Sequence, residues 1–135
     1  MLGFPWAGAR SGTVIIGTGI DIVDIADFRA GLTDALKREV FLPAEIDYAE
    51  SRARPWESYA VRFAAKEAAM KALGAGLAQG VSWKDIELLR RASGNLELAL
   101  HGRALDLATG KAVASSHVSV SHSRASAAAV VVLER

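Results

Sequence analysis

The hydrophobic positions in the first third of the chain predict one buried strand followed by helices. Residues 13–20 are mostly β-branched, apolar or glycine, which is typical of a strand buried on both faces. Residues 22–32 mix apolar with acidic positions and predict a helix. A second helix is expected to begin at residues 42–45, because Pro43 and Glu45 are favoured in a first helical turn.

The longest helix is predicted over residues 56–73, where alanine occupies many positions. Its larger side chains recur at spacings of three and four, so they lie on or near one face: Tyr59, Phe63, Glu67, Met70 and Lys71. Gly74 and Gly76 follow, and glycine is common just past a helix end. The pattern therefore predicts one long helix that ends before Gly74.

The last third of the chain has the period of strands, with one short helix among them. The predicted strands are residues 85–91, 96–100, 117–122 and 125–133. Residues 93–95, Ser-Gly-Asn, indicate a hairpin turn between the first two strands, and residues 102–110 predict the helix. Helices and strands occur in separate runs, which favours an α+β fold over a doubly wound sheet.

The composition is that of one small globular domain. We place this domain at residues 12–135, after an extension at residues 1–11 that is rich in Gly and Pro and expected to be flexible. A hydrophobic content of 51% is high for a small monomer and favours an oligomer. A net charge of +1 does not favour nucleic-acid binding, and the absence of cysteine excludes disulfides and thiolate metal sites.

The hydropathy pattern gives no indication of a membrane or secreted protein. The longest apolar run, residues 127–133, is much shorter than a membrane span. The start of the chain lacks the basic residues and the long apolar region of a signal peptide. We therefore expect a cytoplasmic protein with no membrane partner.

Two short stretches carry the candidate chemistry, residues 19–23 and residues 62–71. Asp21 lies between apolar neighbours in the first stretch, where an unpaired buried charge is costly. Taken alone, Asp21 is best interpreted as the cap of a helix or turn. In the second stretch Glu67 and Lys71 are four residues apart, and taken alone they suit a surface ion pair that contributes about 0.3–0.5 kcal/mol.

The helix face that carries Glu67 argues against a simple surface pair. Glu67 shares this face with Phe63 and Met70, which we expect to be buried, and a carboxylate in such a place needs a cation. Two carboxylates and a lysine that converge suit Mg²⁺ and a phosphate. Magnesium binds one or two carboxylates and completes its shell with water and phosphate oxygens.

Other possible motifs are weaker. His101, His117 and His122 do not have the spacing of a zinc site. His122 falls on the apolar face of its strand, so it is best interpreted as a hydrogen-bonded histidine of the core or its rim. Residues 17–19, Gly-Thr-Gly, lack the third glycine of a dinucleotide-binding loop, and we reject that interpretation.

Gly-Ile-Asp at residues 19–21 and Phe-Ala-Ala-Lys-Glu-Ala-Ala-Met-Lys at residues 63–71 form a two-part pattern, with 46 positions from the aspartate to the glutamate. This pattern resembles the signature of the 4′-phosphopantetheinyl transferases. Residues 83–87 and 118–123 match further patterns of the small holo-[acyl-carrier-protein] synthase group. The resemblance extends over residues 14–134, which is nearly the whole chain.

The resemblance implies a fold and a reaction. The fold would be the α+β fold of these transferases, with a mixed or antiparallel sheet packed on a long helix. The reaction would transfer the 4′-phosphopantetheine group of coenzyme A to a serine of an apo acyl carrier protein, releasing adenosine 3′,5′-bisphosphate. The carrier would serve fatty-acid or polyketide synthesis, and the enzyme would be a homotrimer with active sites between subunits.

The resemblance also implies roles for individual residues. Asp21 and Glu67 would bind Mg²⁺ together with the pyrophosphate, and Glu67 and Lys71 would be the catalytic residues. Attack on phosphorus requires its oxygens to be neutralised and held in line, which suits a metal and a lysine. Coenzyme A would be bound by Arg62, Lys66, Lys71, Gly74, Ser121 and His122. The base for the serine stays open between Glu67 and a water on the metal.

One position departs from the pattern of the family. Six residues after the aspartate of Gly-Ile-Asp, the family usually has an arginine that meets the acidic carrier protein. This chain has Asp27 there, followed by Arg29, Lys37 and Arg38. The departure concerns the choice of carrier protein and leaves the metal-binding residues unchanged.

Two alternative functions can be weighed against the enzyme. A non-catalytic module of the same fold that binds coenzyme A or a carrier protein would not need Asp21, Glu67 and Lys71 together. A purely structural oligomerising domain would leave Glu67 and Lys71 as a surface pair. The enzyme is therefore the preferred hypothesis.

Overall fold

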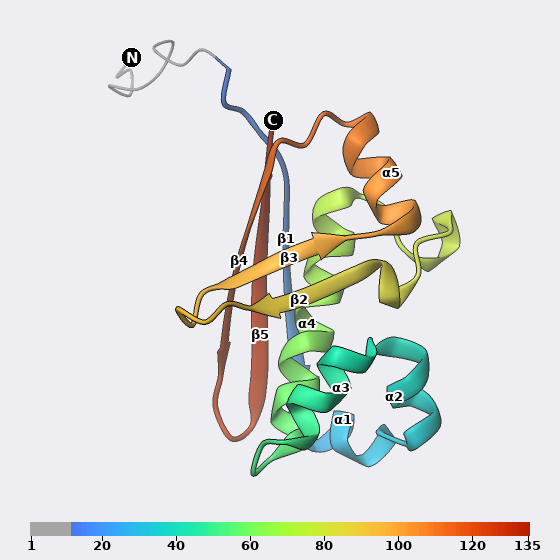
Figure 1. The fold of residues 1–135 in the computed structure, drawn as a ribbon, viewed down its shortest axis with the longest axis vertical. Helices are drawn as coiled ribbons and strands as arrows, with labels where there is room; N and C mark the ends of the chain where they lie inside the picture. The colour runs from blue at the N-terminus through green and yellow to red at the C-terminus, as the bar shows by residue number, and fades with distance from the viewer. Residues whose placement is uncertain (1–11) are drawn as a thin grey trace.

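A long helix packed on a three-stranded antiparallel sheet forms the centre of the computed structural model, which describes residues 12–135 (Figure 1). The helix is α4 (Pro55–Leu73), and the strand order of the sheet is β1 (Ile15–Asp24), β5 (Ser126–Glu134), β4 (Ser115–His122). A second antiparallel sheet pairs β2 (Ile86–Arg90) with β3 (Leu96–Leu100), and it crosses the first sheet in Figure 1. The α+β fold predicted from the sequence is confirmed.

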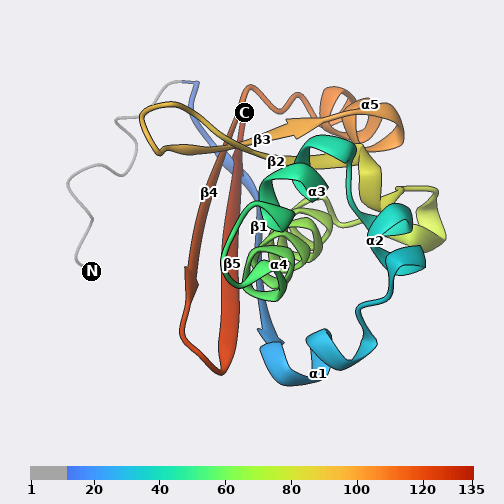
Figure 2. The same cartoon turned by 60° about the horizontal axis from the view of Figure 1, so that its bottom comes forward.

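The remaining elements lie around the central helix. They are α1 (Ile25–Gly31), α2 (Asp34–Val40), α3 (Pro43–Glu50), α5 (Gly102–Gly110) and two 3₁₀ turns, η1 (Leu77–Gln79) and η2 (Trp83–Asp85). Helices α1, α2 and α3 gather at one end of the molecule and α5 lies at the other (Figure 1). In Figure 2, α4 lies between the three-stranded sheet and α2. In the part of the chain that the structure describes, none of the helices combines the length and the apolar character of a membrane span.

Helix α4 approaches β1 very closely because both surfaces consist of small residues. A Cβ atom added to Gly19 would lie 1.8 Å from the carbonyl oxygen of Ala68, and one added to Gly17 would lie 2.0 Å from that of Ala72. Real Cβ atoms do not approach backbone oxygens so closely, so only glycine fits at these two positions. The glycines of residues 17–19 thus serve strand–helix packing.

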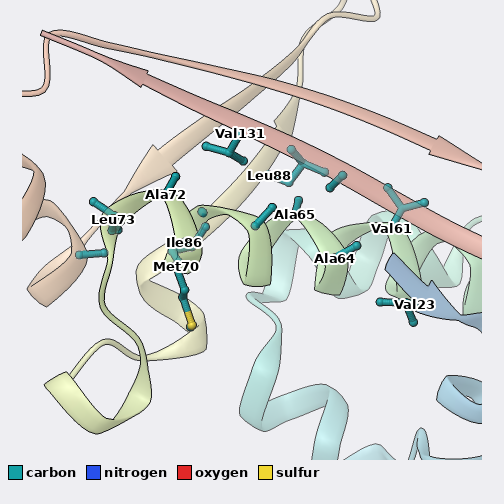
Figure 3. Packing of buried hydrophobic residues seen from close by; sticks show 14 of the residues in the cluster. Val23, Val61, Ala64, Ala65, Met70, Ala72, Leu73, Ile86, Leu88 and Val131 are labelled. Atoms are coloured by element: carbon teal, nitrogen blue, oxygen red, sulfur yellow. The ribbon is translucent and has the colours of Figure 1, made fainter. Parts of the chain in front are cut away.

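The hydrophobic core lies between α4 and the two sheets. Figure 3 shows Ala65 and Ala72 of α4 packed near Val131 of β5 and near Ile86 and Leu88 of β2, and all five are buried. Because the alanines have short side chains, the larger aliphatic residues of the strands fill the space between the layers. The alanine-rich composition of α4 therefore matches its position inside the fold.

The first strand is longer than predicted, and the helix after it begins later. The last residues of β1 pair with β5 as far as Asp24, and this pairing holds them in a strand although they also suit a helix. Helix α1 begins at Ile25, where the Asp24 carboxylate accepts the capping hydrogen bond from the Asp27 N–H (2.9 Å). The interpretation of Asp21 as a cap is therefore wrong.

The other predicted elements agree with the structure to within a few residues. Helix α4 ends at Gly74, which adopts the left-handed conformation with φ of 71°. The hairpin between β2 and β3 and the helix at residues 102–110 are also present. Helix α2 was not predicted, and the prediction for residues 1–11 lies outside the described residues.

Candidate active site

Asp21 and Lys71 meet between β1 and α4. Gly19 and Val23 of β1 are buried toward the helix, and Asp21 lies between them on the same face, with 16% of its side chain exposed. Lys71 Nζ donates to Asp21 Oδ1 (3.2 Å) and to the carbonyl oxygen of Ile20 (2.9 Å). The last turn of α4 is thus joined to the middle of the strand by an ion pair and a hydrogen bond.

Glu67 lies one helical turn before Lys71 and is half-buried, as predicted from the apolar face that it shares. Burial raises the pKa of the Glu67 carboxyl above its ordinary value, and the charge of Asp21 raises it further, whereas Lys71 lowers it. Within residues 12–135, Glu67 forms no ion pair of its own, because Lys71 is paired with Asp21. The two carboxylates therefore repel one another, and Glu67 would gain from an additional cation.

Two open cavities meet at Glu67. The first, which we call the acidic cavity, has a volume of about 410 Å³ and is lined by Asp21, Asp24, Asp27, Phe28, Phe63 and Glu67, among others. The second, the apolar cavity, has a volume of about 470 Å³. Its lining includes Glu67, Met70, Lys71, Gly74, Leu77 and Trp83. A substrate in either cavity would contact the Glu67 carboxylate.

The donor set at this position suits a hard cation that is completed by a substrate. In the described part of the chain, no three His, Asp or Glu side chains are grouped as a complete metal site. Asp21 and Glu67 line one cavity, and the charge of Asp21 adds to the effect of burial in raising the pKa of Glu67, so a divalent cation there would relieve the repulsion between the two carboxylates. Magnesium binds in this way, with two carboxylates and the oxygens of a substrate phosphate.

A third cavity, of about 450 Å³, is rich in arginine, and we call it the arginine pocket. Its lining includes Arg52, Arg54, Arg62, Arg90, Tyr48 and His122. Such a concentration of guanidinium groups is suited to a phosphate or another anion. This pocket was not predicted as a unit, because its residues come from α3, the loop after it, α4, β2 and β4.

Arg62 is the buried member of the arginine pocket, with 3% of its surface exposed. Its Nη1 donates to Ser58 Oγ (2.8 Å), and its guanidinium carbon lies 4.3 Å from the centre of the Tyr48 ring. Its Nε is buried without a hydrogen-bond partner. Burial lowers the pKa of Arg62 from its ordinary value. An anion beside the guanidinium would supply the hydrogen-bond partner that Nε lacks.

Comparison with known proteins decides the family. A family model for the 4′-phosphopantetheinyl transferase superfamily matches residues 17–130. The chain belongs to this superfamily. The holo-[acyl-carrier-protein] synthase of Geobacter sulfurreducens is 47% identical to this chain over 125 aligned residues. The alignment covers 90% of this chain and 99% of the relative.

Solved structures of the same superfamily have the same fold. Holo-[acyl-carrier-protein] synthase from Neisseria meningitidis aligns with a TM-score of 0.80 and 29% identity, over 90% of this chain and 100% of that one. The Helicobacter pylori synthase, solved in complex with coenzyme A, aligns with a TM-score of 0.73 and 28% identity, over 86% of this chain and 98% of that one.

The structure divides the site residues expected of a transferase into three sets. Asp21, Glu67, Lys71 and Gly74 lie around the two cavities that meet at Glu67. Arg62 and His122 line the arginine pocket, and Ser121 is exposed beside His122 at the end of β4. Their roles in binding coenzyme A stay predictions. His122, interpreted from the sequence as a hydrogen-bonded histidine of the core or its rim, is exposed and lines the arginine pocket instead.

Lys66 forms the third set by itself, and its position corrects the sequence-based expectation. Its side chain is 0% exposed, and its Nζ donates to Glu45 Oε1 (2.8 Å) and to two backbone carbonyl oxygens. All three donors of the ammonium group are therefore used inside the chain. A contact between Lys66 and coenzyme A does not agree with this burial, and we do not retain that assignment.

Proposed function

We propose that this chain acts as a holo-[acyl-carrier-protein] synthase. It would transfer the 4′-phosphopantetheine group of coenzyme A to a serine hydroxyl of an apo acyl carrier protein and release adenosine 3′,5′-bisphosphate. The observation that carries the proposal is the meeting of Asp21, Glu67 and Lys71 between β1 and α4 in a chain of this superfamily. The relative from Geobacter sulfurreducens has this activity in its name.

Asp21 and Glu67 are the residues that would hold Mg²⁺. When bound, the ion would neutralise the pyrophosphate oxygens of coenzyme A, which is the main requirement of phosphoryl transfer. Lys71 would hold a phosphate oxygen and stabilise the departing adenosine 3′,5′-bisphosphate. Its side chain is 53% exposed, so the ammonium group can leave Asp21 for the substrate without disturbing the core.

The arginine pocket supports the binding of coenzyme A, which carries a phosphate on its ribose besides the pyrophosphate. The unpartnered Nε–H of Arg62 could donate a hydrogen bond to such a phosphate. Arg62 and Lys71 are nine residues apart on α4, which is about 14 Å along the helix axis. The pocket and the Asp21–Glu67 site are therefore separate on one chain, and an extended ligand or a second subunit is needed to join them.

We propose that the second subunit comes from a homotrimer. The outer face of the three-stranded sheet exposes apolar side chains, of which Ile20 is 68%, Ile22 is 72% and Val130 is 38% accessible. Ile20 and Val130 are cross-strand neighbours, so these residues form a continuous patch. An exposed apolar sheet face is typical of a subunit interface. Association there would bring the cavities of neighbouring subunits together.

The carrier protein and the cellular location stay predictions. We propose a carrier of fatty-acid or polyketide synthesis and a cytoplasmic site of action, as the resemblance implies. Asp27 lines the acidic cavity beside Asp21 and Glu67, so it would face the carrier close to the reacting serine. A carrier with a less acidic surface opposite Asp27 would be preferred.

The proposal is tested by incubating the protein with coenzyme A, Mg²⁺ and a panel of apo carrier proteins, followed by intact-mass measurement of the carrier. We expect the mass increase of one phosphopantetheine group on at least one carrier. Binding of coenzyme A without transfer to any carrier would indicate a binding module instead. Neither binding nor transfer would indicate a structural domain.

A further inference from the structure

The buried ion pair between Lys66 and Glu45 joins four separate segments of the fold. Glu45 belongs to α3 and is 2% exposed, and Lys66 belongs to α4 and is completely buried. Glu45 Oε1 accepts from the Leu42 N–H (3.0 Å) as well as from Lys66, and Glu45 Oε2 accepts from the Leu88 N–H (3.1 Å). The carboxylate thus caps its own helix and also binds β2.

The other side of the network is the backbone around η2. Lys66 Nζ donates to the carbonyl oxygen of Trp83 (3.1 Å) and to that of Ile86. Burial lowers the pKa of Lys66, and the Glu45 carboxylate opposes this shift. Besides the contact between the two side chains, each hydrogen bond of the pair holds one backbone N–H or carbonyl group.

Apolar side chains in place of Glu45 and Lys66 would not hold the backbone in the same way. A buried ion pair can often be replaced by apolar side chains of similar size without loss of stability. Apolar side chains cannot accept from the Leu88 N–H or donate to the Trp83 carbonyl oxygen. What the pair supplies beyond stability is therefore the exact placement of the backbone from η2 to β2.

That backbone carries a wall of the candidate active site. The Trp83 side chain lines the apolar cavity together with Glu67 and Lys71. Its ring centre lies 5.1 Å from that of Phe63, and the Phe63 ring centre lies 5.3 Å from that of Phe28. Phe63 and Phe28 line the acidic cavity on the other side of Glu67. A shift of Trp83 would therefore alter both cavities.

We propose that Glu45 and Lys66 are positioning residues for the transfer reaction. Lys66 holds the Trp83 carbonyl oxygen, and Glu45 holds the Lys66 ammonium group. Together they set the wall of three aromatic rings along which Glu67 and Lys71 meet the substrate. This inference rests on the proposed function for its kinetic part. The placement of Trp83 can be measured without any transfer.

The test uses chains in which Trp83 is the only tryptophan, obtained by Trp6→Phe and Trp56→Phe. In this background we compare the unchanged pair, Lys66→Met, and the double variant Glu45→Leu/Lys66→Met, which removes both charges together and so leaves no unpaired buried charge. We expect the Trp83 emission of the double variant to shift to longer wavelength. We expect its kcat to fall about 10- to 100-fold, because small displacements of site residues have effects of this size.

A core variant, Leu133→Ala in β5, serves as the matched control, because Leu133 is buried but belongs to neither cavity. It should lose stability while keeping kcat and the Trp83 emission. A double variant with unchanged emission and unchanged kcat would overturn the inference. If the parent chain transferred to no carrier, the proposed function would fail, and the Trp83 emission would still show whether the pair positions this wall.

Discussion

Lys71 Nζ lies 3.2 Å from Asp21 Oδ1 although the two residues are 50 positions apart in the chain. The contact places an ammonium group against one of two neighbouring carboxylates, at the point where two cavities meet. Since Lys71 is half-exposed, the ion pair contributes at most about 1 kcal/mol to stability. Its arrangement is therefore better explained by a role toward a ligand than by a role in folding.

Replacing Lys71 with methionine should reduce transfer much more than stability. We expect kcat to fall by roughly 100-fold, the size seen when a group that stabilises transition-state charge is removed. The midpoint of denaturant unfolding should change little, because the side chain is outside the core. Lys71→Arg, which keeps the charge, is the matched control and should retain more activity. Full activity of Lys71→Met would exclude Lys71 from the reaction.

The raised pKa of Glu67 predicts that the ionised Glu67 carboxylate lowers the stability of the folded protein. The folded protein holds this proton more tightly than the unfolded chain does. Its contribution to stability is therefore present below the ordinary carboxyl pKa of 4.5 and is lost as pH rises through the raised value. In the absence of metal, Glu67→Gln should unfold at higher denaturant than the parent at neutral pH, and the difference should shrink toward pH 4.5.

The matched control for Glu67 is Glu97, whose pKa is lowered by the Arg91 side chain. Glu97→Gln should change stability in the opposite direction, with a loss at neutral pH that disappears in acid. If Glu67→Gln were less stable than the parent at neutral pH, burial and the charge of Asp21 would not raise the pKa of Glu67 as we state.

Gly19→Ala should be among the most damaging single substitutions in the chain. Its Cβ would lie 1.8 Å from the Ala68 carbonyl oxygen, so β1 and α4 would have to separate, at a cost of about 3 kcal/mol or more. At Gly31, at the end of α1, an added Cβ would meet nothing within 4 Å. Gly31→Ala should therefore fold with nearly unchanged or slightly higher stability. Thermal unfolding of the two variants compares them directly.

Val130→Lys should prevent the proposed trimer from forming. Val130 is in the central strand of the sheet and is exposed on its outer face, so a lysine there would place a charge in the interface. Leu105 of α5 is 48% exposed and belongs to a different surface, so Leu105→Lys is the matched control. Sedimentation should show a monomer for the first and the parent mass for the second. A parent chain that sediments as a monomer would contradict the trimer.

The sequence predicted the residues that meet, but it could not predict the environment of each. Asp21 and Glu67 were identified together because their two-part pattern resembles a known signature, and β1 and α4 do bring them to one cavity. Lys66 was assigned to coenzyme A binding because it is next to Glu67 in the pattern that resembles the signature, whereas the structure buries it against Glu45. The larger side chains of this helix marked one face as buried, but alanine also covers the side that carries Lys66, and the pattern gave no indication that this side is buried as well.

The arginine pocket illustrates a second limit of the sequence. Arg52 and Arg54 lie in the loop between α3 and α4, and Arg90 is the last residue of β2. They line one pocket with Arg62 only because α3, α4 and β2 pack together. No local pattern records such an arrangement, since it depends on contacts between residues far apart in the chain.

The intact mass of the carrier protein tests the central claim most directly, when it is measured after incubation with coenzyme A and Mg²⁺ and either the parent chain or Glu67→Gln. We predict that the parent adds one phosphopantetheine group to the carrier and that Glu67→Gln, folded and at equal concentration, adds none. Removal of Mg²⁺ from the parent reaction should have the same effect as the substitution. Undiminished transfer by Glu67→Gln would contradict the account of Asp21 and Glu67 as the metal-binding pair.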